Sequence, residues 1–459
     1  MANAVLISTY DMGRQPFGLA SPAAWLRDAG HDVACLDLSR GRLSADIVSA
    51  AALIGFFLPM HTATRLALPV IDRVRKLNPA ARIVAYGLYA PLNEQMLRDR
   101  GVQYVLGGEF EQDLVDVAAD PAPWHPGTLA PRESTPAPRH PAVSLPRLVF
   151  KTPLRDGLLP LSRYAALQTG EQRKVVGYTE ASRGCKHRCR HCPIVPVYDG
   201  RFRIVSAEVV VADARAQVAA GASHITFGDP DFFNGPRHAR DLVTAFAAEF
   251  PSLTYDVTIK IEHLVAHDEL LPLLRDTGCL FVTSAVESID DRVLQHLDKG
   301  HTRVDFERVV DRCRAVGLTL VPTFVAFSPW TTVRSYCELL QAIDALDLVE
   351  HVAPVQLMIR LLIPEGSRLL ELQDVRAVIG SYSPSSLIYP WKHRDPAVDA
   401  LQRSVEAIVG RQLMANREAV FSRIWELAHE AAALTPPLRR DSPRLARAAI
   451  PYLNEPWYC

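Results

Sequence analysis

The sequence has few cysteines, no excess of either charge and no long apolar run. Only 8 of its 459 residues are cysteine, and most are scattered, unlike the dense frameworks of small secreted disulfide proteins. Its 50 Lys and Arg residues balance 51 Asp and Glu residues, so no overall field favours nucleic acid or an anionic membrane. No run approaches the roughly 20 apolar residues that span a bilayer. These absences predict a cytoplasmic protein with neither a membrane nor a nucleic acid as partner.

The amino terminus, MANAVLISTY, lacks the basic stretch and cleavage pattern of a signal peptide, and it predicts a first strand instead. The composition, 48% hydrophobic and 22% charged, is that of an ordinary globular protein. A chain of 459 residues is longer than a single hydrophobic core usually organises, so the length predicts two or more domains.

Residues 1–120 alternate short apolar runs with segments of helical periodicity. This alternation predicts a parallel sheet covered on both faces, hence a doubly wound α/β domain. Residues 121–172 follow as a proline-rich linker, in which helices and sheet ladders are hard to sustain. The expected strands of the first domain are residues 4–9, 32–38, 52–59, 82–87 and 103–109.

Residues 173–375 repeat the alternation over a longer period. Six βα units fit a partial (β/α)6 barrel, whose chemistry is expected at the carboxyl ends of its strands. Residues 376–459 predict a mainly helical region that ends in the tail NEPWYC. The expected barrel strands are residues 175–182, 224–231, 255–263, 279–288, 318–327 and 352–362.

The chain does contain one cluster of cysteines, in SRGCKHRCRHCP at residues 182–193. Cys185, Cys189 and Cys192 have the spacing C-x3-C-x2-C. A structural zinc site needs four protein ligands, and His187 or His191 could supply the fourth. Iron–sulfur clusters are normally held by four thiolates, so three would leave one iron open. Spacing alone leaves both metals open.

The segment GCKHRCRHC resembles the cluster loop of the radical S-adenosylmethionine (SAM) superfamily. This resemblance implies that Cys185, Cys189 and Cys192 hold a 4Fe-4S cluster whose fourth iron is chelated by SAM. It also places His191 where the family has an aromatic residue against the adenine. The motif SRGCKHRCRHCP thus identifies residues 173–375 as a candidate radical SAM barrel.

The resemblance extends beyond the loop. FGDPDFF (227–233) stands where the family has a Gly-Gly-Glu motif, which implies that Gly228 and Asp229 hold the SAM ammonium; the literal GGE at 107–109 lies in the other domain. TSAVESIDDRVLQHLDKGHT implies a ribose-binding role for Glu287, and IRLLIPEGS directs Arg360 towards SAM. Plainer alternatives are a turn for the aspartates after the strand and a helix-start acid for Glu287.

Charged residues near the expected barrel strands are further candidates. Lys260 and Glu262 alternate along VTIKIEH and share one face of the expected strand. An inward charged pair is costly unless it is paired or functional, so both are candidates for the substrate cavity. The basic residues around the cysteines are expected to offset cluster charge or to dock an acidic electron donor, such as flavodoxin or ferredoxin; they are Arg183, Lys186, Arg188 and Arg190.

The first domain resembles the cobalamin-binding domains that precede some radical SAM barrels. Their D-x-H-x-x-G loop gives cobalt a histidine ligand, whereas STYDMGRQPFG here has Asp11 but no His. Cobalamin is therefore a possible cofactor whose usual ligand is absent. Over nearly its whole length the chain resembles radical SAM proteins named for a C-terminal Cys-Sec-Ala-Glu-Pro or Cys-Cys-Ala-Glu-Pro tail. On this basis a UGA selenocysteine codon is expected after Cys459, which is a candidate catalytic residue.

We predict a radical SAM enzyme that cleaves SAM reductively to start radical chemistry on an unidentified small-molecule or metalloid substrate. One alternative keeps the cluster but transfers a 3-amino-3-carboxypropyl group, or a methyl group with cobalamin. A second alternative is a zinc-stabilised α/β binding module without catalytic activity. The sequence does not choose among substrates.

Overall fold

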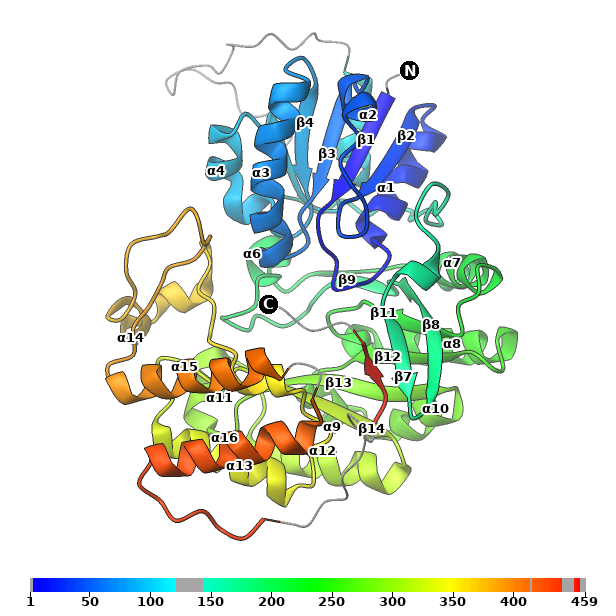
Figure 1. Cartoon of the computed structure of the whole chain (residues 1–459). Helices are drawn as coiled ribbons and strands as arrows, with labels where there is room; N and C mark the ends of the chain where they lie inside the picture. The colour runs from blue at the N-terminus through cyan, green and yellow to red at the C-terminus, as the bar shows by residue number, and fades with distance from the viewer. Residues whose placement is uncertain (1–2, 121–142, 413–414, 440–449, 455–459) are drawn as a thin grey trace.

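The computed structural model describes residues 3–120, 143–412, 415–439 and 450–454 (Figure 1). Residues 121–142 of the proline-rich linker and the candidate residue Cys459 therefore lie outside the described residues. Within the described residues, no helix is long and apolar enough to cross a membrane. Two sheets dominate the structure, one in each half of the chain.

The N-terminal sheet has six parallel strands in the order β2-β1-β3-β4-β5-β6. Five of them are the predicted strands, and β6 is added from the proline-rich segment. The order 2-1-3-4-5 is that of flavodoxin-like sheets, whose ligands bind at the carboxyl ends of the strands beside the β1/β3 switch point. The strands are β1 (Asn3–Ser8), β2 (Asp32–Asp37), β3 (Leu53–Phe57), β4 (Arg82–Tyr86), β5 (Tyr104–Gly108) and β6 (Val143–Ser144).

Helices cover both faces of this sheet because successive strand residues point to opposite sides. Leu6 belongs to the core shared with α1 (Phe17–Asp28) and α5 (Glu111–Ala119). Ile7 belongs to the core shared with α3 (His61–Leu77) on the other face. The predicted doubly wound α/β domain is confirmed. The remaining helices here are α2 (Ala45–Ser49) and α4 (Glu94–Asp99).

The second sheet is the half-barrel, with seven strands in the order β14-β13-β12-β11-β8-β7-β15. The five strands from β14 to β8 are parallel, whereas β7 pairs antiparallel with both β8 and the edge strand β15. The strands are β7 (Ala166–Thr169), β8 (Gln172–Thr179), β11 (His224–Phe227), β12 (Thr254–Thr258), β13 (Cys279–Glu287), β14 (Thr319–Phe324) and β15 (Tyr452–Leu453).

Helices line the outer side of the half-barrel, and two C-terminal helices extend this layer (Figure 1). Apolar residues of α15 (Pro396–Arg411) and α16 (Arg417–Ala431) belong to the same hydrophobic core as the barrel strands. The other helices are α7 (Ala207–Ala219), α8 (Pro236–Glu249), α9 (Ile261–Ala266), α10 (Leu271–Asp276), α11 (Asp291–Leu297), α12 (Arg303–Val316), α13 (Val333–Ala345) and α14 (Gln373–Arg376).

The predicted sixth barrel strand, residues 352–362, is wrong. Pro354–Leu357 form a 3-10 helix instead, and one parallel bridge between Phe327 and Arg360 marks where the strand was expected. Pro354 lacks a backbone N–H and suits the first position of a helical turn. The half-barrel is therefore open on this side.

Candidate active site

The three clustered cysteines lie in the loop between β9 (Ser182–Gly184) and α6 (Val195–Tyr198). All three are free, Cys189 buried and the other two partly buried. Burial raises the pKa of Cys185 to about 12 and that of Cys192 to about 11, and the neighbouring thiols add to both shifts. A metal cluster would bind these cysteines as thiolates and displace their protons.

Hydrogen bonds from other elements hold this loop in place. The Asn234 side chain accepts from Lys186 N at 3.1 Å and donates to the Gly184 carbonyl at 3.1 Å. Arg190 N donates to the Leu297 carbonyl at 2.9 Å. The loop is thus fixed at both ends, to the segment after β11 and to α11, as a preorganised ligand loop requires.

Glu287, at the end of β13, connects to the same loop. Its carboxylate lies 3.1 Å from His191 Nε2 and 3.5 Å from Lys299 Nζ, and all three side chains are largely buried. Burial would raise the pKa of Glu287, but Lys299 and His191 outweigh this and hold it at about 2. The two predicted residues His191 and Glu287 therefore contact each other, and the Glu287 carboxylate is held in its ionised form. His191 Nδ1 is buried and has no hydrogen-bond partner among the described residues.

Asp229 is buried after β11 and accepts from Ala181 N at 2.9 Å and from Ser182 Oγ at 2.5 Å. Burial raises its pKa to about 7, although the hydrogen bonds from these two donors oppose the shift. Gly228 is required by packing, because a Cβ there would lie 1.7 Å from the Tyr178 hydroxyl. A buried carboxylate that lacks a cation suits an incoming ammonium group.

Lys260 and Glu262 do not share the face of a strand, so this part of the prediction is wrong. β12 ends at Thr258, and α9 begins at Ile261 with Lys260 as its N-cap residue. The two side chains are nevertheless paired, with Lys260 Nζ donating to Glu262 Oε2 at 2.8 Å. Lys260 is buried and Glu262 is partly exposed.

Sequence reasoning missed a cluster beside this pair. His187 of the cysteine loop lies 3.0 Å from His263 of α9, measured between their Nε2 atoms. Asp231 Oδ2 lies 2.7 Å from His263 Nδ1. Burial and Lys260 lower the pKa of His187. The sequence signal was available: His187, Asp231 and His263 all lie at or just beyond the carboxyl ends of expected strands.

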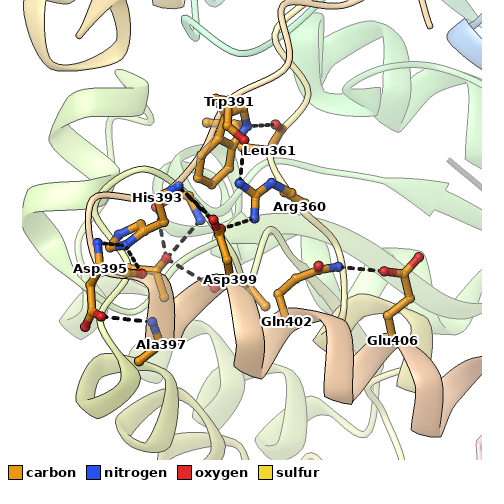
Figure 2. Close-up of polar contacts among 12 residues, drawn as sticks. Arg360, Leu361, Trp391, His393, Asp395, Ala397, Asp399, Gln402 and Glu406 are labelled. Atoms are coloured by element: carbon orange, nitrogen blue, oxygen red, sulfur yellow. Dashed lines mark hydrogen bonds and ion pairs between the residues drawn. The ribbon is translucent and has the colours of Figure 1, made fainter. Parts of the chain in front are cut away.

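Arg360 contacts residues of the C-terminal region (Figure 2). Its guanidinium donates to Asp399 at 2.7 Å and to the Trp391 carbonyl at 2.7 Å, and it stacks on the Trp391 ring at 3.5 Å. Asp399 belongs to α15, so these contacts fasten the C-terminal helices to the open side of the half-barrel. We expected the Arg360 side chain to point towards SAM, but its guanidinium is held by Asp399 and Trp391 instead.

Arg183 is not part of an exposed basic surface, contrary to the prediction. Its side chain is 9% exposed and lies 2.6 Å from Glu111, 3.4 Å from Glu109 and 2.8 Å from Glu180. Glu109 and Glu111 follow β5, so this cluster connects the two sheets. Burial raises the pKa of Glu109 to about 7 despite Arg183. The literal GGE motif therefore ends in an interdomain ion pair.

A cavity of about 200 Å³ lies between the N-terminal domain and the barrel, next to the cysteine loop. It lies at the carboxyl ends of the parallel strands, the ligand-binding edge of such sheets. It is smaller than the about 300–1,000 Å³ typical of small-molecule pockets. Its lining includes Gly18, Phe57, Gly87 and Gly108 from the N-terminal domain and Ser182, Ile194, Gly228 and Pro230 from the second domain. It includes no histidine.

Comparisons with known proteins agree with this geometry. The family model of the Radical SAM superfamily matches residues 179–331, which contain the cysteine loop, Asp229 and Glu287. Residues 179–331 are therefore a radical SAM domain, which is the part of the chain that this family model matches.

Two curated relatives show the extent of the likeness. The ribosomal protein uS12 methylthiotransferase RimO of Desulforudis audaxviator is 28% identical over 187 residues, 37% of this chain and 40% of the relative. The hopanoid C-3 methylase of Methylococcus capsulatus is 24% identical over 163 residues, 34% of this chain and 31% of the methylase. The chain thus matches less than half the length of these curated relatives.

Solved structures resemble a larger part of the chain. The cobalamin-dependent SAM radical enzyme OxsB, with aqua-cobalamin and SAM bound, superposes with a TM-score of 0.70 at 14% identity, over 94% of this chain and 72% of OxsB. The radical SAM methyltransferase TsrM of Kitasatospora setae, with cobalamin and a 4Fe-4S cluster bound, superposes with a TM-score of 0.54 at 20% identity, over 76% of this chain and 71% of TsrM. At these identities the likeness shows the two-domain fold.

Proposed function

We propose that the protein binds a 4Fe-4S cluster and cleaves SAM reductively to start radical chemistry on a small molecule held between its two domains. The observation that carries this proposal is the cysteine loop, anchored beside the Glu287 carboxylate and the buried Asp229 carboxylate. When bound, the reduced cluster supplies the electron that breaks a carbon–sulfur bond of SAM. Cys185, Cys189 and Cys192 would hold the cluster.

The chain's own residues position SAM in this proposal. Asp229 accepts a hydrogen bond from the SAM ammonium, because its carboxylate is otherwise held by two neutral donors, Ala181 N and Ser182 Oγ. Glu287, kept ionised by Lys299 and His191, accepts the ribose hydroxyls. The cavity lining brings apolar rings such as Phe57 and Phe110 to the domain interface, where they exclude water from a reactive radical.

Product analysis tests this proposal. Reconstituted protein is incubated with SAM and a reductant under anaerobic conditions, and the adenosyl product is identified. We expect 5′-deoxyadenosine, and its loss together with the iron in Cys189→Ala. Cys35→Ser is the matched control, since Cys35 is a partly buried free cysteine on β2. Methylthioadenosine as the product would replace the proposal with aminocarboxypropyl transfer. Colourless protein with zinc and no sulfide would indicate the binding module.

Cobalamin-dependent methyl transfer is a second candidate, favoured by the place of the interdomain cavity at the β1/β3 switch point. The residues present do not fit a corrin ring in this conformation. The cavity holds only about 200 Å³, and Phe57 fills the space next to Gly18, where a Cβ would lie 2.2 Å from its ring. His31 precedes β2 and therefore lies at the amino ends of the strands, whereas the cavity lies at their carboxyl ends.

A binding titration decides on cobalamin. We expect hydroxocobalamin to bind only after the cavity is widened, so Phe57→Ala should bind it more tightly than the unaltered protein. S-adenosylhomocysteine formed together with methylated substrate would support methyl transfer. Absence of binding by either protein would remove this candidate.

The resemblance to proteins with a Cys-Sec tail is also a proposal, tested by sequencing the codons that follow Cys459.

A further inference from the structure

Three metal-binding side chains converge beside the cysteine loop without belonging to it. One nitrogen of His187, one nitrogen of His263 and a carboxylate oxygen of Asp231 all lie within 4.8 Å of one another. The two imidazole Nε2 atoms are 3.0 Å apart, and Asp231 Oδ2 is 3.7 Å from His187 Nε2. Metal–ligand bonds of about 2.0–2.2 Å place neighbouring ligand atoms about 3–3.5 Å apart. The two imidazole nitrogens are at such a distance, and the whole set lies within 4.8 Å.

Two of these groups each have one buried polar atom without a hydrogen bond within the described residues. Asp231 is 1% exposed and His263 is 3% exposed. Asp231 Oδ2 and His263 Nδ1 are 2.7 Å apart, yet neither makes a hydrogen bond within the described residues. Leaving such an atom unpaired costs about 1–3 kcal/mol. The other Asp231 oxygen accepts from Phe233 N at 3.1 Å, which fixes the carboxylate with Oδ2 directed at the two rings.

The surroundings resemble the support that metal-binding histidines usually have. Glu262 Oε2 lies 3.4 Å from His187 Nδ1 and is itself held by Lys260 at 2.8 Å. A carboxylate on one ring nitrogen leaves the other free to bind metal. Asn234, which clamps the backbone of the cysteine loop, keeps His187 opposite Asp231.

We propose that His187, Asp231 and His263 bind a divalent first-row metal ion such as Zn²⁺, at a site distinct from the iron–sulfur cluster. Two imidazoles and one carboxylate are a donor set for zinc and its neighbours rather than for an iron–sulfur cluster, which thiolates hold. Three protein ligands leave one coordination position open for water or for an oxygen or nitrogen atom of a substrate. Glu262 is a positioning residue that orients His187.

Metal analysis tests the site in untagged protein that carries its cluster. After dialysis against Zn²⁺ and desalting, zinc, iron and acid-labile sulfide are measured per chain, and zinc affinity is measured by chelator competition. We expect one zinc per chain in addition to the cluster. Asp231→Asn, which keeps the shape of the side chain, and His263→Ala should lose this zinc with iron and sulfide unchanged. Glu262→Gln should retain it with roughly 10- to 100-fold weaker affinity, as for other outer-sphere carboxylates.

His267→Ala is the matched control, because His267 follows α9 and lies outside the cluster; it should bind zinc like the unaltered protein. The Cys185→Ala/Cys189→Ala/Cys192→Ala variant separates this site from the thiolates. It should still bind Co²⁺, with ligand-field bands but no sulfur charge-transfer absorption. The proposal is overturned if no zinc binds beyond the cluster. It is also overturned if zinc binding survives Asp231→Asn and His263→Ala, or if Co²⁺ binding disappears with the cysteines.

Discussion

His191 Nε2 lies 3.1 Å from Glu287 Oε1, so the cysteine loop contacts the end of β13 directly. Glu287 adopts a left-handed backbone with φ of 69°, where the β13–β14 register shifts. Such a conformation costs about 1–3 kcal/mol for a residue other than glycine. His191 and Lys299 both contact the Glu287 carboxylate, and these two contacts fix it at the carboxyl end of β13.

Glu287→Gln should weaken SAM binding about 10- to 100-fold, because a hydrogen bond to a charged group contributes about 1.5–3 kcal/mol. The substitution keeps the shape of the side chain but leaves Lys299, 4% exposed, without its carboxylate. SAM affinity is measured by equilibrium dialysis on cluster-loaded protein. Glu307→Gln on α12, at an exposed ion pair, is the control. Equal SAM affinity of Glu287→Gln and the unaltered protein would contradict the ribose-binding role.

Asp229 should make SAM binding depend on pH. Burial raises its pKa to about 7, so its carboxylate is protonated below this pH and ionised above it. An ammonium group binds the ionised form, and SAM affinity should therefore rise between pH 6 and pH 8. Asp229→Asn should bind SAM weakly and lose this part of the rise. The variant also corrects for titration of the SAM amine itself, which ionises in the same range. Parallel pH profiles for the two proteins would count against the proposed ammonium contact.

Glu109 should make the folded protein less stable as the pH rises. Its pKa is about 7 in the folded protein and 4.5 ordinarily, chiefly because of burial. The stability that this raised pKa contributes is fully present below pH 4.5 and is lost as the pH rises through 7. The loss amounts to about 3 kcal/mol. The Gln side chain of Glu109→Gln stays neutral at every pH. Between about pH 5.5 and about pH 8, which lie on either side of the folded pKa, the urea midpoint of this variant should therefore fall less than that of the unaltered protein.

Some slope should persist in Glu109→Gln, because burial also raises the pKa of Glu180 in the same cluster. Glu249→Gln, at a more exposed ion pair with Arg215, should keep the full slope of the unaltered protein. A Glu109→Gln slope as steep as that of the control would mean that Glu109 is ionised throughout.

The parts of the fold with strong local signals could be predicted from the sequence. The N-terminal strands are short runs of apolar residues between helices, and all five were expected close to their observed bounds. The sixth barrel strand failed because residues 352–362 are apolar enough for a strand, while Pro354 starts a 3-10 turn. Lys260 and Glu262 were misplaced because the periodicity of β12 continues into the first turn of α9.

The site could be predicted only where a spacing carries the chemistry. The cysteine triplet is such a case, since three ligands fall within one loop. Arg183 stands in the same basic segment as Arg188, and local sequence does not distinguish a buried arginine from an exposed one. Two of the three glutamates that surround Arg183, Glu109 and Glu111, come from a domain more than 70 residues earlier in the chain. The cluster of His187, Asp231 and His263 likewise forms only when three separate segments, two loops and the helix α9, come together in space.

Arg183 and Arg188 should respond very differently to the same substitution. Arg183 lies among three glutamates with 9% of its side chain exposed, whereas Arg188 and its partner Asp199 are 58% and 56% exposed. Removing one partner of a buried ion cluster costs about 3–5 kcal/mol, and an exposed pair contributes only about 0–1 kcal/mol. Arg183→Met should therefore lower the urea midpoint strongly, and Arg188→Met should leave it nearly unchanged.

Adding Glu111→Gln should distinguish repulsion among the glutamates from lost packing. Glu111 lies 2.6 Å from Arg183, and without the arginine it becomes a buried carboxylate with no cation opposite it. The double variant Arg183→Met/Glu111→Gln should recover part of the lost midpoint, because it removes one of the like charges. Midpoints are measured on cluster-free protein, so that loss of iron does not obscure unfolding. Equal midpoints for the single and double variants would show that Arg183 stabilises the interface by packing rather than by charge.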